Sequence, residues 1–361
     1  MVTVGLSWVL NFSNAVLGVG LLAMPYCYQE CGVLLATLMI LLTGHLTKLT
    51  CNFLLLAGVR TRKSTYEQLA LLVYGRKGKL LCELSMIGVV FGTLIAFQIV
   101  IGDLAPAVAN SQFGFARSWL NRAGFMLACC VFVLPLSLMR SVSSLASFNA
   151  ISMTFYVVYI FSVVCMALPS VGQMEWWTDI WFWKPSAFLK CLPIIVLSYN
   201  CQGQVFIFYA ALPDPNVKVM TAIVHKAINL VNAFYIVVGL FGYIAFYKVG
   251  IGGNILENFS NGFLTDCIKL GFLGSVIVSY PLMCFPIRSS INSLFFAGRK
   301  QGLLHDVITN AAAYIAPDKF VLITLGLVSS SVFIGVLVPK VEVVLNITGE
   351  VLKIHFLIPS E

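Results

Sequence analysis

Two long apolar runs of this sequence are interrupted near their centres by amide side chains and glycines. One run contains Asn14 and the stretch Gly18–Val19–Gly20, and the other contains Asn200 and Gln202. A helix that breaks inside such a run leaves unpaired N–H groups where one half begins and unpaired carbonyl oxygens where the other half ends. The N–H groups attract an anionic group such as a carboxylate, and the carbonyl oxygens suit a cation. The two interruptions therefore indicate a binding site for a small ligand, with a cation beside it.

Gly18 and Gly20 have a second interpretation, because small residues also allow two helices to pack closely. For the glycines alone, the two interpretations are about equally good. The amides of Asn14, Asn200 and Gln202 favour a site, since polar groups within hydrocarbon cost free energy unless they are used.

The elements that position these residues must be membrane-spanning helices. Of the 361 residues, 60% are apolar and 10% are charged, and the mean hydropathy is +0.95. Soluble domains are about 45–50% apolar and about 25% charged. This composition excludes a soluble enzyme, a nucleic-acid-binding module, a disordered chain and a disulfide scaffold. We therefore expect an all-α polytopic protein in a lipid bilayer, without a nucleic-acid partner.

Nine apolar runs are long enough to cross a bilayer, since about 20 apolar residues span its hydrocarbon core. They fall at about 5–29, 33–57, 79–109, 121–139, 143–169, 188–212, 221–248, 264–287 and 319–338. The runs are continuously apolar rather than alternating, which argues against a β-barrel. The stretch 65–74 is too short and too polar to cross, and we expect a short interfacial helix there.

The distribution of Lys and Arg predicts the orientation of these spans. With the N-terminus inside, 13 of these residues fall on the inner side and 8 on the outer side. The largest group lies at 60–79, in the first inner loop. Cytoplasmic loops carry an excess of Lys and Arg, so this distribution favours an inside N-terminus, and the net charge of +8 reflects the basic inner loops.

Two ionisable residues lie within the second span. His45 and Lys48 are three residues apart and therefore share one face of a helix. Lys48 is far from both ends of the span, although its long side chain allows it to snorkel. His45 is a candidate proton sensor, because histidine titrates near neutral pH.

No arrangement of residues indicates catalysis. The histidines are scattered along the chain, at His45, His225, His305 and His355. The 11 cysteines show no paired spacing of the kind that binds metals. We therefore expect a protein that is not an enzyme and has no cofactor apart from a coupling ion.

Four motifs resemble the amino acid/auxin permease family. Residues 14–26 (NAVLGVGLLAMPY) are similar to its first helix. Residues 285–290 (FPIRSS) are similar to the end of helix eight in its sodium-coupled neutral amino acid transporters, and 101–104 and 134–138 match the same branch. The motifs occur in the right order, and the similarity extends to about residue 349.

The resemblance implies a leucine-transporter fold, with two inverted repeats of five helices each and an eleventh helix after them. It also implies amino acid transport by alternating access, often as symport with Na⁺ or a proton. The transporter domain would cover 1–339, with the first repeat at about 5–169 and the second from about 188. The divergent end at 340–361 leaves the second repeat incomplete, so the last two helices would be missing.

The resemblance further implies roles for individual residues. The substrate carboxylate would be received by backbone N–H groups of Gly18, Val19 and Gly20. The amino group and side chain of the substrate would face Tyr199, Asn200, Cys201 and Gln202. A Na⁺ ion would take oxygens from Asn14, Ala15, Leu17, Ser275 and Ser279. Oxygen ligands suit a hard cation, although hydrogen bonds between helices explain the two serines equally well.

Three functional hypotheses follow. The chain is a monomeric transporter of amino acids, with neutral amino acids as the expected substrates. Alternatively, it is a membrane sensor that binds amino acids without moving them. The missing helices add weight to the sensor hypothesis. The third hypothesis is an inactive truncated isoform, because loss of these helices would expose the surfaces that they normally cover.

Overall fold

The computed structural model describes residues 5–113, 119–140, 146–173, 176–260, 262–295, 315–338, 341, 343–345, 347 and 348. Its helices are α1 (Leu6–Val16), α2 (Gly20–Cys31), α3 (Val33–Thr61), α4 (Tyr66–Phe113), α5 (Trp119–Ser137), α6 (Ala146–Gln173), α7 (Trp176–Asp179), α8 (Phe188–Ser198), α9 (Gln202–Ala211), α10 (Val217–Ala245), α11 (Phe263–Phe295) and α12 (Pro317–Leu337). Two 3₁₀ turns, Pro185–Ala187 and Ile255–Glu257, precede α8 and α11. The predicted all-α architecture is confirmed.

The apolar runs form helices because a helix satisfies every backbone polar group within its own segment, as the hydrocarbon of a bilayer requires. Among the described residues, eight spans are long and apolar enough to cross a membrane, and a ninth results when the bent pair α1 and α2 is counted as one. These nine elements coincide with the nine apolar runs of the sequence. The chain is therefore a multi-pass integral membrane protein.

Two of the spans are broken where the sequence places its polar and glycine residues. The axes of α1 and α2 differ by 59°. Leu17 is extended, at φ −63° and ψ 160°, and ends α1 before the two glycines. The second break separates α8 from α9 at residues 199–201, where Tyr199 and Cys201 depart from helical geometry.

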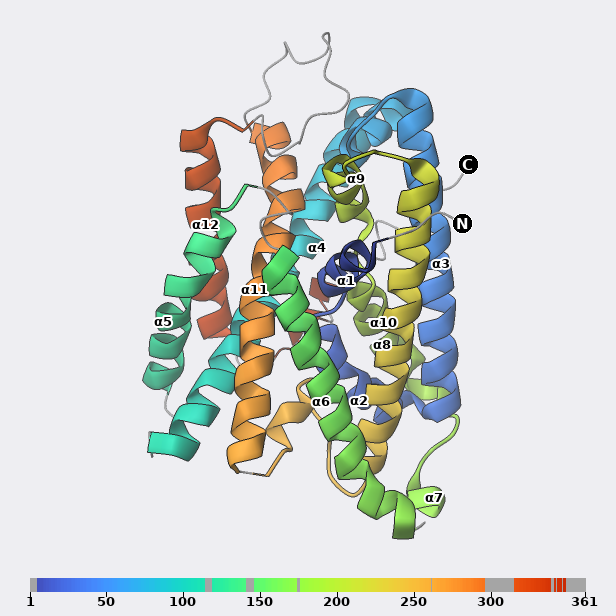
Figure 1. Cartoon of the computed structure of the whole chain (residues 1–361), viewed down its shortest axis with the longest axis vertical. Helices are drawn as coiled ribbons and strands as arrows, with labels where there is room; N and C mark the ends of the chain where they lie inside the picture. The colour runs from blue at the N-terminus through green and yellow to red at the C-terminus, as the bar shows by residue number, and fades with distance from the viewer. Residues whose placement is uncertain are drawn as a thin grey trace.

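The broken helices lie in the interior of the bundle (Figure 1). Helix α10 packs against α1, α2, α3 and α6, while α4 and α11 pack along each other. The two broken spans are thus enclosed by long continuous helices, which bury the irregular backbone away from lipid.

The predicted interfacial helix forms the first part of α4. Its helical geometry stops at Gly75, whose φ of +67° belongs to the left-handed region that favours glycine. This short segment is anchored on α11, because the hydroxyl of Ser290 donates a hydrogen bond to the buried carboxylate of Glu67.

Most of the predicted divergent end at 340–361 lies outside the described residues. The part that is described is helical at 341, 343–345, 347 and 348. It packs against α4, where a methyl group at Gly92 would lie only 2.0 Å from the hydroxyl of Thr348. The division of the chain into two repeats stays a prediction.

Candidate binding site at the two helix breaks

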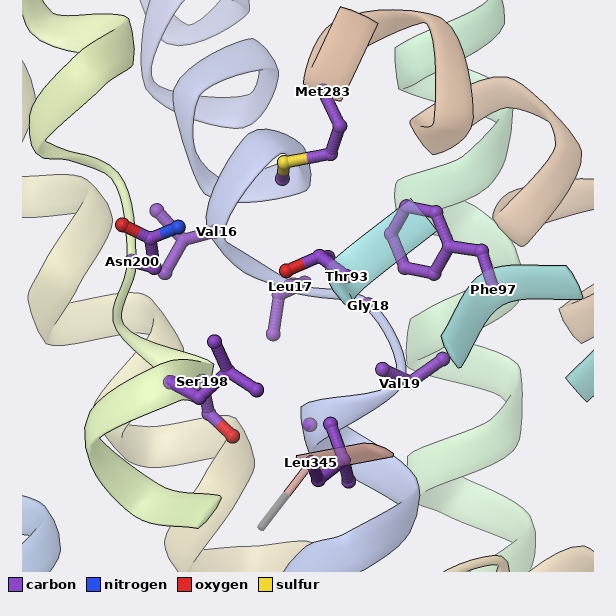
Figure 2. Close-up of a pocket in the computed structure, with 12 residues that line it drawn as sticks. Val16, Leu17, Gly18, Val19, Thr93, Phe97, Ser198, Asn200, Met283 and Leu345 are labelled. Atoms are coloured by element: carbon purple, nitrogen blue, oxygen red, sulfur yellow. The ribbon is translucent and has the colours of Figure 1, made fainter. Parts of the chain in front are cut away.

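A small cavity lies where the two breaks meet (Figure 2). Its walls come from both broken spans, from α4 and α11, and from the helical segment around residue 345. The residues that line it are Val16, Leu17, Gly18, Val19, Gly20, Thr93, Phe97, Leu197, Ser198, Asn200, Met283 and Leu345. The two polar interruptions of the sequence are therefore brought together at one place.

The glycines of the first break allow close contact with its neighbours. A Cβ atom at Gly20 would lie 2.4 Å from the Ser198 hydroxyl oxygen. At Gly18, a Cβ atom would lie 3.0 Å from the ring of Phe97. A side chain at position 20 would therefore collide with Ser198, and glycine there allows the two breaks to pack closely.

Helix α10 ties the two breaks to each other. The Tyr235 hydroxyl donates a hydrogen bond to the Ser198 carbonyl oxygen at 2.9 Å, and it lies 3.4 Å from the Val16 carbonyl oxygen. Both acceptors are carbonyls near the end of a half-helix, where intrahelical partners are missing. Tyr235 thus satisfies exposed backbone in both broken spans and is itself fully buried.

The start of α2 offers backbone donors to the cavity. Within this helix, the Leu21 and Leu22 N–H groups bond to the carbonyls of Gly18 and Val19, both at 3.1 Å. Val19 and Gly20 come before the first bonded residue, so their N–H groups have no partner within the helix. The N-terminal end of α2 also carries the positive end of the helix dipole, which favours an anionic group.

The predicted substrate residues separate into two groups. Residues 18–20 and Asn200 line the cavity. Tyr199, Cys201 and Gln202 do not line it, although they occupy the same break. Their roles toward a substrate stay predictions.

The side chain of each of these three residues has a partner outside the cavity. The Tyr199 hydroxyl donates to the Asn232 side-chain oxygen at 2.6 Å. The sulfur atoms of Cys201 and Cys51 are 3.8 Å apart. The Gln202 side-chain oxygen accepts a hydrogen bond from the Cys201 N–H at 3.1 Å, so it closes the start of α9.

A second polar group lies beside the cavity, between α1, α6 and α11. The Asn14 side-chain nitrogen donates to the Asn149 side-chain oxygen at 2.9 Å. The Ser279 hydroxyl donates to the Asn14 side-chain oxygen at 3.5 Å. All three side chains are completely buried, and the Asn149 side-chain nitrogen has no hydrogen-bond partner.

The other predicted ion ligands lie close by but differ in their bonding. The Ser275 hydroxyl donates to the Gly271 carbonyl at 3.0 Å and to the Ser152 carbonyl at 3.4 Å. The shorter contact stays within α11, and the longer one, to α6, is the helix-to-helix hydrogen bonding that was the alternative for the serines. Ala15 and Leu17 are buried next to Asn14, in the last turn of α1 and just after it.

The donor set fits a hard cation such as Na⁺. Asn14 and Ser279 present neutral oxygens from two different helices, and the end of α1 supplies carbonyl oxygens. In the part of the chain that the structure describes, no three His, Cys, Asp or Glu side chains are grouped to hold a metal ion. Binding of an ion by these oxygens stays a prediction.

Several residues of this region escaped prediction from the sequence. Thr93, Phe97, Met283 and Leu345 line the cavity, and they come from segments that carry no unusual pattern. Asn149 had a signal, since it is the only carboxamide in the apolar run 143–169.

Comparisons with known proteins agree with this architecture. A family model described as "Transmembrane amino acid transporter protein" matches residues 3–360, which extends past residue 349, where we expected the similarity to end. The chain is 37% identical over 345 residues to a Xenopus laevis protein named "Putative sodium-coupled neutral amino acid transporter 10". It is 35% identical over 343 residues to the Homo sapiens protein solute carrier family 38 member 10. Each alignment covers 94% of this chain but 32% and 30% of the relative, so the chain spans about a third of their length.

Solved structures confirm the predicted leucine-transporter-like fold. The structure of MhsT in complex with L-phenylalanine aligns with 97% of this chain and 88% of its own, with a TM-score of 0.59 and 15% identity. A Na⁺-coupled sialic acid symporter aligns with 96% of this chain and 74% of its own, with a TM-score of 0.55 and 10% identity. By the family match and by its fold, the chain belongs to the transmembrane amino acid transporter family.

Proposed function

We propose that the protein transports neutral amino acids across a membrane by alternating access, coupled to Na⁺. The observation that carries this proposal is the meeting of two broken helices at one cavity, with Tyr235 bonded to the backbone of α8 and close to that of α1. Discontinuous helices at the centre of two spans are the usual binding-site construction of secondary transporters. The relatives named for sodium-coupled amino acid transport support the same assignment.

The substrate carboxylate binds the N–H groups of Val19 and Gly20 at the positive end of α2. The amino group lies toward the carbonyl of Val16 and the side chain of Asn200, on the opposite wall. None of the described lining residues is charged, and Phe97 and Met283 contribute apolar surface. A charged substrate side chain would be left unpaired there, so the lining favours neutral amino acids.

Na⁺ binds between Asn14 and Ser279, with carbonyl oxygens of Ala15 and Leu17 as further ligands. The ion would draw the end of α1 toward α11 and replace the long hydrogen bond between Asn14 and Ser279. Because the same break of α1 also lines the cavity, an ion there stabilises the backbone that receives the substrate. This shared segment provides the physical basis for coupling.

The test is uptake by the purified chain in proteoliposomes. We expect saturable uptake of a radiolabelled neutral amino acid, such as alanine or glutamine, that falls when choline replaces Na⁺. Scintillation-proximity binding on the same protein distinguishes the alternatives. Binding without uptake would support the sensor, and the absence of both would support an inactive chain.

A further inference from the structure

Helices α3 and α10 pack side by side (Figure 1). A group of basic and amide side chains from these two helices is exposed on the outer surface of the bundle. We call it the central basic patch, and it consists of His45, Lys48, His225, Lys226 and Asn229. The Lys48 ammonium donates a hydrogen bond to the Asn229 side-chain oxygen at 2.5 Å. Lys48 is partly buried, and the other four residues are exposed. His225 lies within electrostatic range of both His45 and Lys48.

The patch faces lipid. Around His45 and Lys48, the exposed side chains of α3 are Leu41, Leu42, Leu46 and Leu49, with 39–55% of their surface accessible. Such a leucine surface on a membrane helix is the surface that contacts acyl chains. The positive groups therefore lie in an otherwise apolar face.

The depth of the patch is central. Helices α3 and α10 have 29 residues each, which corresponds to about 43 Å. Lys48 is the sixteenth residue of α3, and Asn229 is the thirteenth of α10. The hydrocarbon core is about 30 Å thick, so both residues lie near the midplane, about 15 Å from either headgroup layer.

Nothing in the described part of the chain neutralises this patch. Neither α3 nor α10 contains an Asp or a Glu residue. The ion pairs Lys79–Glu83, Arg122–Asp103 and Lys190–Glu30 do not include Lys48. A cationic side chain at the centre of a bilayer costs free energy unless it meets an anion. The patch therefore offers a place for a carboxylate from another molecule.

The depth decides between the sources of that anion. A phospholipid headgroup would have to sink through about half of the hydrocarbon core to reach Lys48. A second copy of this chain is a poor source, because the intramembrane acids among its described residues are occupied. Glu83 and Asp266 are buried, and Asp103 is paired with Arg122 at 3.4 Å.

We propose that the central basic patch docks a membrane-spanning helix of another protein that carries a Glu or Asp residue near its midpoint. Its carboxylate would pair with Lys48. His45, on the same face of α3, and His225, one turn along α10 from Asn229, lie beside this pair and can donate to the second carboxylate oxygen. This inference does not depend on the proposed transport function.

The test uses two synthetic helices of leucine and alanine, identical except for a central Glu or Gln. Each carries an acceptor dye and is reconstituted in phosphatidylcholine vesicles with the full chain, labelled with a donor dye at its N-terminus. Energy transfer measures association at increasing peptide density. We expect the Glu helix to associate about tenfold more tightly than the Gln helix.

Variants then locate the contact. Lys48→Met should abolish the preference for the Glu helix. Lys218→Met, at the start of α10 and away from the patch, should leave this preference unchanged. Lys48→Gln keeps a polar side chain of similar shape, so it tests the charge if the Met variant does not fold. Equal association of the two peptides, or a preference that survives both Lys48 variants, would overturn the proposal. Phosphatidylglycerol that displaces the Glu helix through Lys48 would also overturn it, in favour of a lipid site.

Discussion

The hydroxyl of Tyr235 donates a hydrogen bond to the carbonyl oxygen of Ser198 at 2.9 Å, from a helix that packs against both broken spans. The same hydroxyl lies 3.4 Å from the carbonyl of Val16, in the other break. One side chain therefore couples the ends of α1 and α8. Any movement that opens the cavity between the two breaks must change this contact.

Removing that hydroxyl should loosen the site. Tyr235→Phe deletes a buried hydrogen bond worth about 1 kcal/mol and leaves the Ser198 carbonyl unpaired. We expect the KM for the amino acid to rise about fivefold, with a small decrease in melting temperature. Uptake kinetics in proteoliposomes measure the effect. Tyr209→Phe removes an exposed hydroxyl and is the matched control, which should keep the original KM.

A methyl group at Gly20 should prevent the close approach of the two breaks. Its Cβ would lie 2.4 Å from the Ser198 hydroxyl oxygen and 3.2 Å from the Tyr235 hydroxyl oxygen. Overpacking of this kind costs about 1–3 kcal/mol, so we expect Gly20→Ala to reduce uptake about tenfold. Gly326→Ala is the control, because a Cβ there contacts nothing. Normal uptake by the Gly20→Ala variant would contradict this prediction, because it would show that transport does not need the close packing of the two breaks.

The contact between Asn14 and Ser279 predicts a specific Na⁺ dependence. A hydroxyl that ligates a cation contributes about 1.5–3 kcal/mol. Ser279→Ala should therefore raise the Na⁺ concentration for half-maximal uptake about tenfold or more. The maximal rate at saturating Na⁺ should change little, because the substrate cavity is intact.

Two controls make the Na⁺ experiment decisive. Ser329→Ala removes an exposed hydroxyl that bonds only within α12, and it should have no effect. Ser275→Ala separates the two interpretations of that serine. An unchanged Na⁺ dependence would assign Ser275 to helix packing, whereas a shift equal to that of Ser279→Ala would make it a ligand.

The ring of Phe97 should set the size of the accepted side chain. It lines the cavity and lies in contact with Gly18. Phe97→Ala removes apolar volume, so we expect the preference to shift toward bulkier amino acids such as leucine or phenylalanine. Competition assays against a labelled small substrate measure this shift. Phe161→Ala, on the lipid-facing side of α6, should leave the selectivity unchanged.

The spans and their two breaks were predictable from the sequence, because both depend on local composition. A continuous apolar run must become a helix in lipid, whichever neighbours it meets. Glycines and amides within such a run mark where the helix ends. Residues 18–20 and Asn200, which were predicted to bind substrate, line the cavity between the breaks, and their role toward a substrate stays a prediction.

Only the tertiary structure decided which side chains of the breaks face the cavity. Tyr199, Cys201 and Gln202 lie in the same break as Asn200, yet they turn toward Asn232, Cys51 and the start of α9. The helices packed around a short irregular segment determine which way its side chains point. The hydrophobic periodicity of the sequence does not contain this information. For the same reason, Thr93, Phe97 and Met283 were found only after α4 and α11 were assembled around the breaks.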